Sequence, residues 1–167
     1  MTLPYGAAAL FVSLSIILAA TLGGATLPQA LAPFEQEILT AHNEVRASLH
    51  ERPLTWSRKL ANVAQDWADR LAEQGEFYHR QNSGYGENLY MIRPGPAAPE
   101  HVVHAWAAEA PDYDHVSNSC MRMCGHYTQI VWRETSKVGC AVSRGTGREV
   151  WVCNYDPPGN WVGEKPY

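Results

Sequence analysis

Apolar residues recur every three or four positions in three stretches of the chain, and this spacing predicts three helices, each with one apolar face. The first predicted helix covers residues 34–49. The second is the most regular and ends near Gly75, since glycine commonly terminates helices. The third begins at Pro99 and stops before Pro111, because proline disfavours a helical conformation in the residue before it. Glu109 is therefore expected in the last turn of the third helix.

The apolar pattern changes after Cys124, where β-branched and aromatic residues become frequent. Three short segments of this kind, residues 126–132, 138–142 and 150–155, predict three antiparallel strands. Residues 81–99 are rich in glycine and proline and predict a loop. Helices followed by strands within 167 residues predict a single α+β domain, in which helices cover an antiparallel sheet.

The N-terminal segment contains no charged residue before Glu35 and includes a long apolar run that ends in small residues. This pattern is typical of an export signal, so we assign residues 1–32 as a signal peptide and residues 33–167 as the mature domain. Cleavage is expected after Ala25 or after Ala32. No Lys or Arg precedes the apolar run, and an uncleaved membrane anchor stays open as an alternative. We expect a secreted, extracellular protein, or a periplasmic one in a bacterium.

The charge of the chain excludes two classes of partner. Its formal net charge is −4 at pH 7, and no cluster of Lys or Arg occurs. Nucleic acids and anionic membranes attract basic surfaces, so neither is expected to bind. We also expect the protein to be a monomer.

Four cysteines lie in the C-terminal third of the chain, and in an exported protein they favour disulfides. If the last two predicted strands form a hairpin centred between Thr146 and Gly147, then Cys140 and Cys153 lie opposite one another. Opposed strand residues approach closely enough for a disulfide. The expected pairs are Cys140 with Cys153 and Cys120 with Cys124.

Zinc is the alternative interpretation of the first two cysteines. Cys120 and Cys124 are followed closely by His126, and His115 lies just before them. Thiolates and imidazoles at such spacing are common zinc ligands. An oxidising compartment makes the disulfide the preferred interpretation.

Four segments of the chain carry a specific resemblance: AHNEVR at 41–46, YGENLY at 85–90, GHYTQIVW at 125–132 and CNYDPPGN at 153–160. They resemble the signature segments of the CAP superfamily, which includes cysteine-rich secretory proteins, insect venom antigen 5 and plant pathogenesis-related class one proteins. The motifs are most similar to those of the plant proteins. The resemblance runs from about residue 42 to the C-terminus.

The resemblance implies a three-layer α-β-α sandwich with a shallow cleft that contains two histidines and two glutamates. The matching residues are His79, Glu87, Glu109 and His126. Neutral imidazoles bind zinc or another divalent cation, while carboxylates bind the cation or orient the rings. The same four residues are candidates for general acid and base catalysis. A purely structural role is the alternative: Glu87 would accept backbone hydrogen bonds, and Glu109 would pair with a ring nitrogen.

The function implied by the resemblance is that of a secreted binding module. Its expected ligands are a lipid or sterol in an apolar groove and a divalent cation in the cleft, with a role in defence or signalling and another protein as a further candidate partner. No serine or cysteine lies beside a histidine as a nucleophile, so we expect binding rather than catalysis. The alternative function is that of a metal-dependent hydrolase that uses the same four residues.

Other conspicuous residues have structural explanations. The six tryptophans are expected to pack in the core. His42, Asn43 and Arg46 are expected to connect the first helix to neighbouring loops. His101 and His104 are expected to be exposed on the third helix.

Two features of the chain bear on the comparison with plant relatives. Those relatives usually have six cysteines, whereas Gly75 and Gly145 stand where the third pair aligns. The last residues resemble the segment from which plant relatives release a signalling peptide, which here would be residues 157–167. The alternative is a tail docked on the domain through Trp161.

Overall fold

The structure is a computed structural model that describes residues 30–93, 95–145 and 147–167. Residues 1–29 of the predicted export signal, with the Ala25 cleavage site, lie outside these residues. Within the described ranges, no helix is both long and apolar enough to cross a membrane. The segment Leu31–Tyr167 forms one compact unit.

The first two predicted helices are present. Helix α1 covers Pro33–Ala47 and begins with proline, whose fixed φ suits the first turn of a helix. Helix α2 covers Arg58–Gln74 and is capped by Ser57, whose hydroxyl accepts a hydrogen bond from the Leu60 amide at 3.3 Å. It ends at Gly75, where φ is 77°, a conformation that glycine adopts without steric penalty.

Helix α3 covers Pro99–Ala107 and is shorter than predicted. Glu109 therefore lies two residues beyond the helix, directly before a 3₁₀ turn at Ala110–Asp112, rather than in the last helical turn. The cause is Pro111, which lacks an amide hydrogen and so favours a tight turn over continuation of the helix.

The central sheet has four strands in the order β1-β5-β6-β2. Their bounds are Thr55–Trp56 for β1, Gly86–Ile92 for β2, Lys137–Gly145 for β5 and Arg148–Asp156 for β6. The β5–β6 hairpin has the predicted register, with Cys140 opposite Cys153. Strand β2 is antiparallel to β6, but β1 is parallel to β5, so the sheet is mixed rather than wholly antiparallel.

Two sequence-based predictions of local structure were wrong. Residues Gly125–Ile130 form the short helix α4, where a strand was predicted. Tyr127 and Ile130 are buried there, and a short apolar run does not by itself distinguish a buried helix from a strand. Strand β2 lies within the segment predicted as a loop. Apart from Gly86, its first residue, the glycines and prolines of that segment flank the strand instead of filling it.

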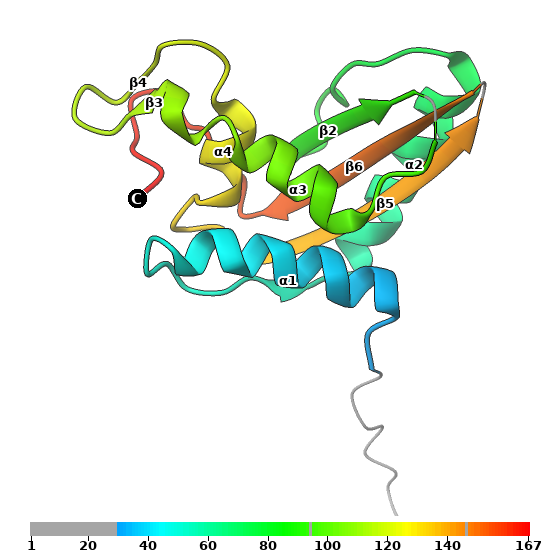
Figure 1. The fold of residues 1–167 in the computed structure, drawn as a ribbon, viewed down its shortest axis with the longest axis horizontal. Helices are drawn as coiled ribbons and strands as arrows, with labels where there is room; N and C mark the ends of the chain where they lie inside the picture. The colour runs from blue at the N-terminus through cyan, green and yellow to red at the C-terminus, as the bar shows by residue number, and fades with distance from the viewer. Residues whose placement is uncertain (1–29, 94, 146) are drawn as a thin grey trace, which may run out of the picture. The chain divides into compact units, whose positions relative to one another are not determined.

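The sheet carries a separate apolar core on each face. Along β6, Trp151, Cys153 and Tyr155 pack with residues of α1, α3 and α4, whereas Val150 and Val152 pack with residues of α2. Figure 1 shows α1 and α3 in front of the sheet and α2 behind it. This alternation builds the three-layer α-β-α sandwich that was expected.

Both predicted disulfides are present. The Cα atoms of Cys120 and Cys124 are 5.7 Å apart, and those of Cys140 and Cys153 are 4.1 Å apart. No cysteine is free, so the zinc interpretation of Cys120 and Cys124 was wrong. The first disulfide joins a small hairpin, β3 (Tyr113–Asp114) and β4 (Ser119–Cys120), to the start of α4.

Candidate functional site

The first half of the site is a hydrogen-bonded pair of His79 and Glu87. Nδ1 of His79 lies 2.8 Å from Oε1 of Glu87, which also accepts a hydrogen bond from the Arg80 amide at 3.0 Å. The Glu87 side chain, on β2, is only 6% exposed, whereas that of His79 is 58% exposed. A rigid strand therefore holds the carboxylate, which in turn orients a ring that faces solvent.

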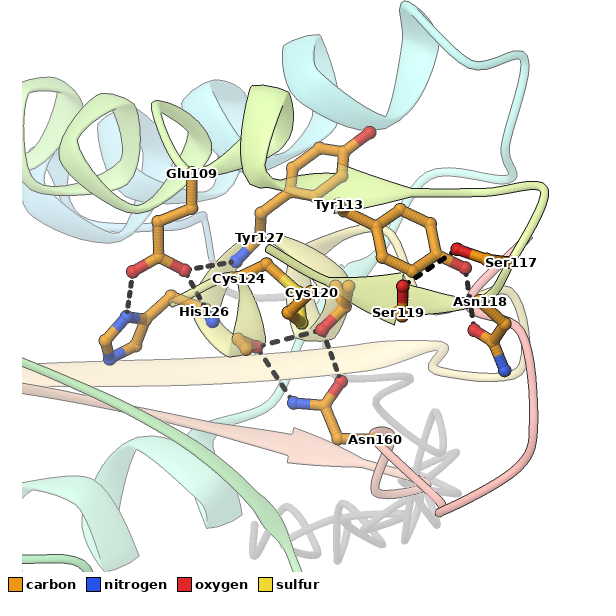
Figure 2. Close-up of a disulfide and its surroundings, with 12 residues drawn as sticks. Glu109, Tyr113, Ser117, Asn118, Ser119, Cys120, Cys124, His126, Tyr127 and Asn160 are labelled. Atoms are coloured by element: carbon orange, nitrogen blue, oxygen red, sulfur yellow. Dashed lines mark hydrogen bonds and ion pairs between the residues drawn. A yellow bond between two sulfur atoms is a disulfide. The ribbon is translucent and has the colours of Figure 1, made fainter. Parts of the chain in front are cut away.

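The second half is the pair of His126 and Glu109 (Figure 2). Nδ1 of His126 lies 2.6 Å from Oε1 of Glu109. The other carboxylate oxygen, Oε2, accepts hydrogen bonds from the amides of His126 at 2.9 Å and Tyr127 at 3.3 Å. Glu109 thus orients the ring and also satisfies amides in the first turn of α4, which would otherwise have no partner within the helix.

The two pairs fix the same tautomer in both histidines. An ionised carboxylate can only accept a hydrogen bond, so Nδ1 carries the proton in each ring and Nε2 is the nitrogen available to a ligand. The hydrogen bond to Glu87 raises the pKa of His79 above its ordinary value.

The two histidines line one cavity of about 200 Å³. Its lining residues are His79, Glu87, Asn88, Met123, Gly125, His126 and Asn160. Three of the four residues predicted from the sequence therefore meet there, while Glu109 contacts the cavity only through His126.

The residues present fit a divalent cation. Besides the two imidazole Nε2 atoms, Oε2 of Glu87 is buried and has no hydrogen-bond partner among the described residues. Nitrogen and carboxylate oxygen are zinc ligands. A cation bound here would be held by the imidazoles, and the carboxylates that hold Nδ1 would set the orientation of the rings.

Another cluster of metal-binding residue types is not a site. Among the described residues, His42, Cys140 and Cys153 are the only histidine, cysteine or acidic side chains that bring three ligand atoms within 4.8 Å of one another. Both sulfur atoms belong to the disulfide. The four predicted residues do not form such a group, so further ligands of a bound cation would come from elsewhere.

Sequence reasoning missed two asparagines that support the site. Nδ2 of Asn88 donates hydrogen bonds to the backbone oxygen of His126 at 3.0 Å and to the Tyr155 hydroxyl at 3.2 Å. Asn160 donates to the Gly125 oxygen at 2.8 Å and accepts from the Thr128 hydroxyl at 2.7 Å (Figure 2). Both asparagines lie in motifs that were recognised in the sequence, at 85–90 and 153–160. The interpretation of these motifs considered their charged residues and not the side-chain amides.

A buried network continues from Asn88 to α1. The hydroxyl of Tyr155 lies 2.8 Å from Nε2 of His42, whose Nδ1 contacts the Ile38 oxygen at 2.7 Å. Burial lowers the pKa of His42 to about 4, so the ring is neutral at physiological pH. Nδ1 therefore donates to Ile38 and Nε2 accepts from Tyr155, and His42 has the structural role that was expected.

The other structural predictions from the sequence are mostly correct. Asn43 exchanges two hydrogen bonds with the backbone of Leu54, and Arg46 donates to four backbone oxygens of neighbouring loops. His101 and His104 are exposed. Trp161, however, is 56% exposed and is not a core residue.

Comparison with known proteins identifies the family. The sequence matches the family described as "CAP: Cysteine-rich secretory protein family" over residues 39–155. The chain belongs to the CAP family. The matched CAP segment includes all four histidine and glutamate residues of the site.

Relatives of this CAP protein include "Pathogenesis-related protein 1A" of Nicotiana tabacum, which is 44% identical over 136 residues, or 80% of each chain. Among solved CAP-like folds, venom allergen-like protein 4 of Schistosoma mansoni is 27% identical, with a TM-score of 0.64 over 82% of this chain and 95% of the other. A crystal structure of NaASP2 with Zn²⁺ is 25% identical, with a TM-score of 0.65 over 81% of this chain and 86% of the other.

Proposed function

We propose that this chain is an exported defence protein that binds a divalent cation, such as zinc, through Nε2 of His79 and Nε2 of His126. The observation that carries the proposal is that two carboxylates hold the two rings through Nδ1 while both rings line one cavity. A ligating histidine typically donates its second ring nitrogen to a carboxylate in this way.

The comparisons support each part of the proposal. Export agrees with the description of the family as secretory proteins and with the presence of all four cysteines in disulfides. Defence agrees with the name of the tobacco relative, and a cation agrees with the presence of Zn²⁺ in the NaASP2 crystal.

The cavity between α1 and α3 gives little support to a lipid ligand. It has a volume of about 290 Å³ and includes Glu37, Glu44 and Glu100 in its lining. These carboxylates disfavour the head group of a fatty acid, and lipid pockets are lined mainly by apolar side chains. We therefore favour a cation over a lipid or sterol as the ligand.

Catalysis also has less support than binding. In the described part of the chain, no histidine ring nitrogen forms a hydrogen bond with a serine, threonine or cysteine side chain. The site therefore lacks an activated nucleophile of that type.

Calorimetric titration with zinc tests the proposal. We expect His79→Gln and His126→Gln each to weaken zinc binding by about tenfold or more, because each removes one of the two imidazole ligands. His104→Gln is the matched control, since His104 is exposed on α3 and does not line the cavity.

Thermal unfolding of each variant shows whether it is folded. Wild-type protein that binds no zinc, or folded site variants that bind it as tightly as the control, would contradict the proposal.

A further inference from the structure

The loop between Cys120 and Cys124 carries two methionines that do not pack in a core. Met121 is 70% exposed and Met123 is 67% exposed. Exposed methionine forgoes the favourable free energy that burial of its apolar side chain would provide. Only Met123 lines the cavity that contains the two histidines.

The backbone holds Met123 at this cavity. Cys124, the next residue, is buried, forms the disulfide with Cys120 and directly precedes α4, which carries His126. On the other side, the Met121 amide donates a hydrogen bond to the Asp112 oxygen at 2.7 Å. The loop is therefore fixed on both sides of Met123, while its side chain is exposed and can change rotamer.

Among the side chains that line the cavity, Met123 carries a soft ligand atom, and the two imidazoles are ligands of intermediate softness. Two imidazole nitrogens and one thioether sulfur suit copper, and a thioether favours Cu(I) in particular, whereas carboxylate and carbonyl oxygens suit magnesium and calcium. All four cysteines are in disulfides, so no thiolate competes for such an ion. Oε1 of Glu87 and both oxygens of Glu109 accept hydrogen bonds from the rings and from backbone amides. Oε2 of Glu87 is the one carboxylate oxygen of this described pair of glutamates without such a partner.

From these contacts we propose that the cavity is a Cu(I) site in which the sulfur of Met123 is the third ligand, beside Nε2 of His79 and Nε2 of His126. This inference rests on the proposed cation site. It adds to the divalent cation a monovalent one, Cu(I), and names the ligand that would select it. It also gives a role to Met123, the second methionine in the sequence CMRMCGH, whose cysteines form a disulfide.

The test compares Met123→Leu with Met121→Leu. Both substitutions keep an apolar side chain of similar volume at an exposed position of the same loop, but only the first replaces a methionine that lines the cavity. Cu(I) is added as its acetonitrile complex under nitrogen in competition with bicinchoninate, so that no reducing agent meets the disulfides. Zinc affinity is measured on the same samples.

We expect Met123→Leu to weaken Cu(I) binding by about tenfold or more, with little change in zinc binding, and Met121→Leu to change neither. X-ray absorption at the copper edge should show a sulfur ligand in the wild type that is lost in Met123→Leu. Equal Cu(I) affinity in the two variants, or no sulfur around copper in the wild type, would overturn the inference while zinc binding keeps the proposed function intact. Wild-type protein that binds neither ion would overturn both.

Discussion

At the scale of single residues, the two glutamates of the site determine which nitrogen each histidine offers. Glu87 and Glu109 each hold an Nδ1 proton, and each also accepts a backbone hydrogen bond. The structural role and the ligand-binding role that the sequence left as alternatives are therefore compatible in the same side chains. Removal of either carboxylate is therefore expected to affect both the local structure and ligand binding.

The raised pKa of His79 predicts the pH dependence of cation binding. A protonated imidazole cannot bind a metal, so zinc affinity should fall as the pH falls through the pKa of His79. Because the hydrogen bond to Glu87 raises this pKa, Glu87→Gln should move the fall in affinity to lower pH. NMR titration of the His79 ring should show its pKa moving down in the same variant.

The same pair affects stability with a defined sign. A histidine whose pKa is raised on folding stabilises the folded state fully below its unfolded pKa, about 6.5, and this contribution is lost as the pH rises through the folded pKa. The Glu87→Gln variant should therefore lose more stability at pH 5 than at pH 8. An equal loss at both pH values would contradict the assignment of the pKa shift to Glu87.

The residues of the site were predicted from motifs, and their arrangement was not. His79, Glu87, Glu109 and His126 could be named because each lies in or near a recognised segment. Asn88 and Asn160 were missed because a neutral amide has no chemistry of its own, and its value depends on which oxygens the fold brings near it. Met123 was missed because the flanking cysteines gave the stronger signal.

At the scale of secondary structure, periodicity predicted the long helices and failed for the short elements. Helix α2 has a regular apolar face and a glycine at its end, so its bounds were nearly correct. Helix α4 has only 6 residues, which is too short for helical periodicity to differ from a strand pattern. Its helical form depends on a carboxylate from Glu109, far away in the sequence.

The end of α2 is joined to the sheet by an arginine. From the sequence, Gly75 and Gly145 are expected to stand where plant relatives have a third cysteine pair. Here Arg148, opposite Gly145 in the hairpin, donates hydrogen bonds to the backbone oxygens of Leu71 at 2.8 Å and Glu76 at 3.1 Å. A positive charge at a helix C-terminus is favourable, so this buried arginine joins α2 to the sheet.

We predict that Arg148→Gln lowers the free energy of unfolding by about 2–3 kcal/mol, because buried backbone oxygens lose hydrogen bonds from a charged donor. The control is Arg70→Gln on α2, because the exposed ion pair of Arg70 with Asp66 contributes less than about 1 kcal/mol to stability. Urea unfolding of both variants gives the comparison. Similar losses in the two variants would show that Arg148 does not anchor the helix.

At the scale of the whole described unit, the C-terminal tail is part of the domain. The Arg133 amide donates to the Pro166 oxygen at 2.6 Å, and the Tyr167 hydroxyl lies 3.2 Å from that of Tyr127. The His115 ring stacks on the Tyr167 ring, with centroids 4.9 Å apart. Docking through Trp161, the alternative given from the sequence, was wrong, since that side chain is 56% exposed. The tail contacts the domain through Asn160 and through its last two residues instead.

The docked tail bears on release of residues 157–167. Asp156, the residue before the expected cut, is the last residue of β6, and its backbone oxygen accepts a hydrogen bond from the Ser136 amide at 3.1 Å. The Pro157 oxygen accepts from the Thr135 hydroxyl at 2.9 Å. A protease needs an extended, unpaired backbone, so cleavage would first require this region to open.

Deletion of Pro166 and Tyr167 should free the Arg133 amide. We expect faster hydrogen exchange at Arg133 and no change at Cys140, which lies in the centre of the sheet. Val162→Ala is the control, because Val162 is fully exposed in the same tail. Slow exchange at Arg133 after the deletion would mean that the last two residues do not hold the tail.

The position of Tyr167 has a practical consequence for anyone who purifies or labels this protein. Its backbone oxygen lies 2.8 Å from Nε2 of His115, and its ring packs against the rings of Tyr113 and Tyr127. A purification tag or fluorescent fusion attached after Tyr167 would have to pass between these side chains and would weaken their contacts. The residue before α1 is the better point of attachment, because in the described part of the chain no hydrogen bond joins α1 to the aromatic side chains around Tyr167.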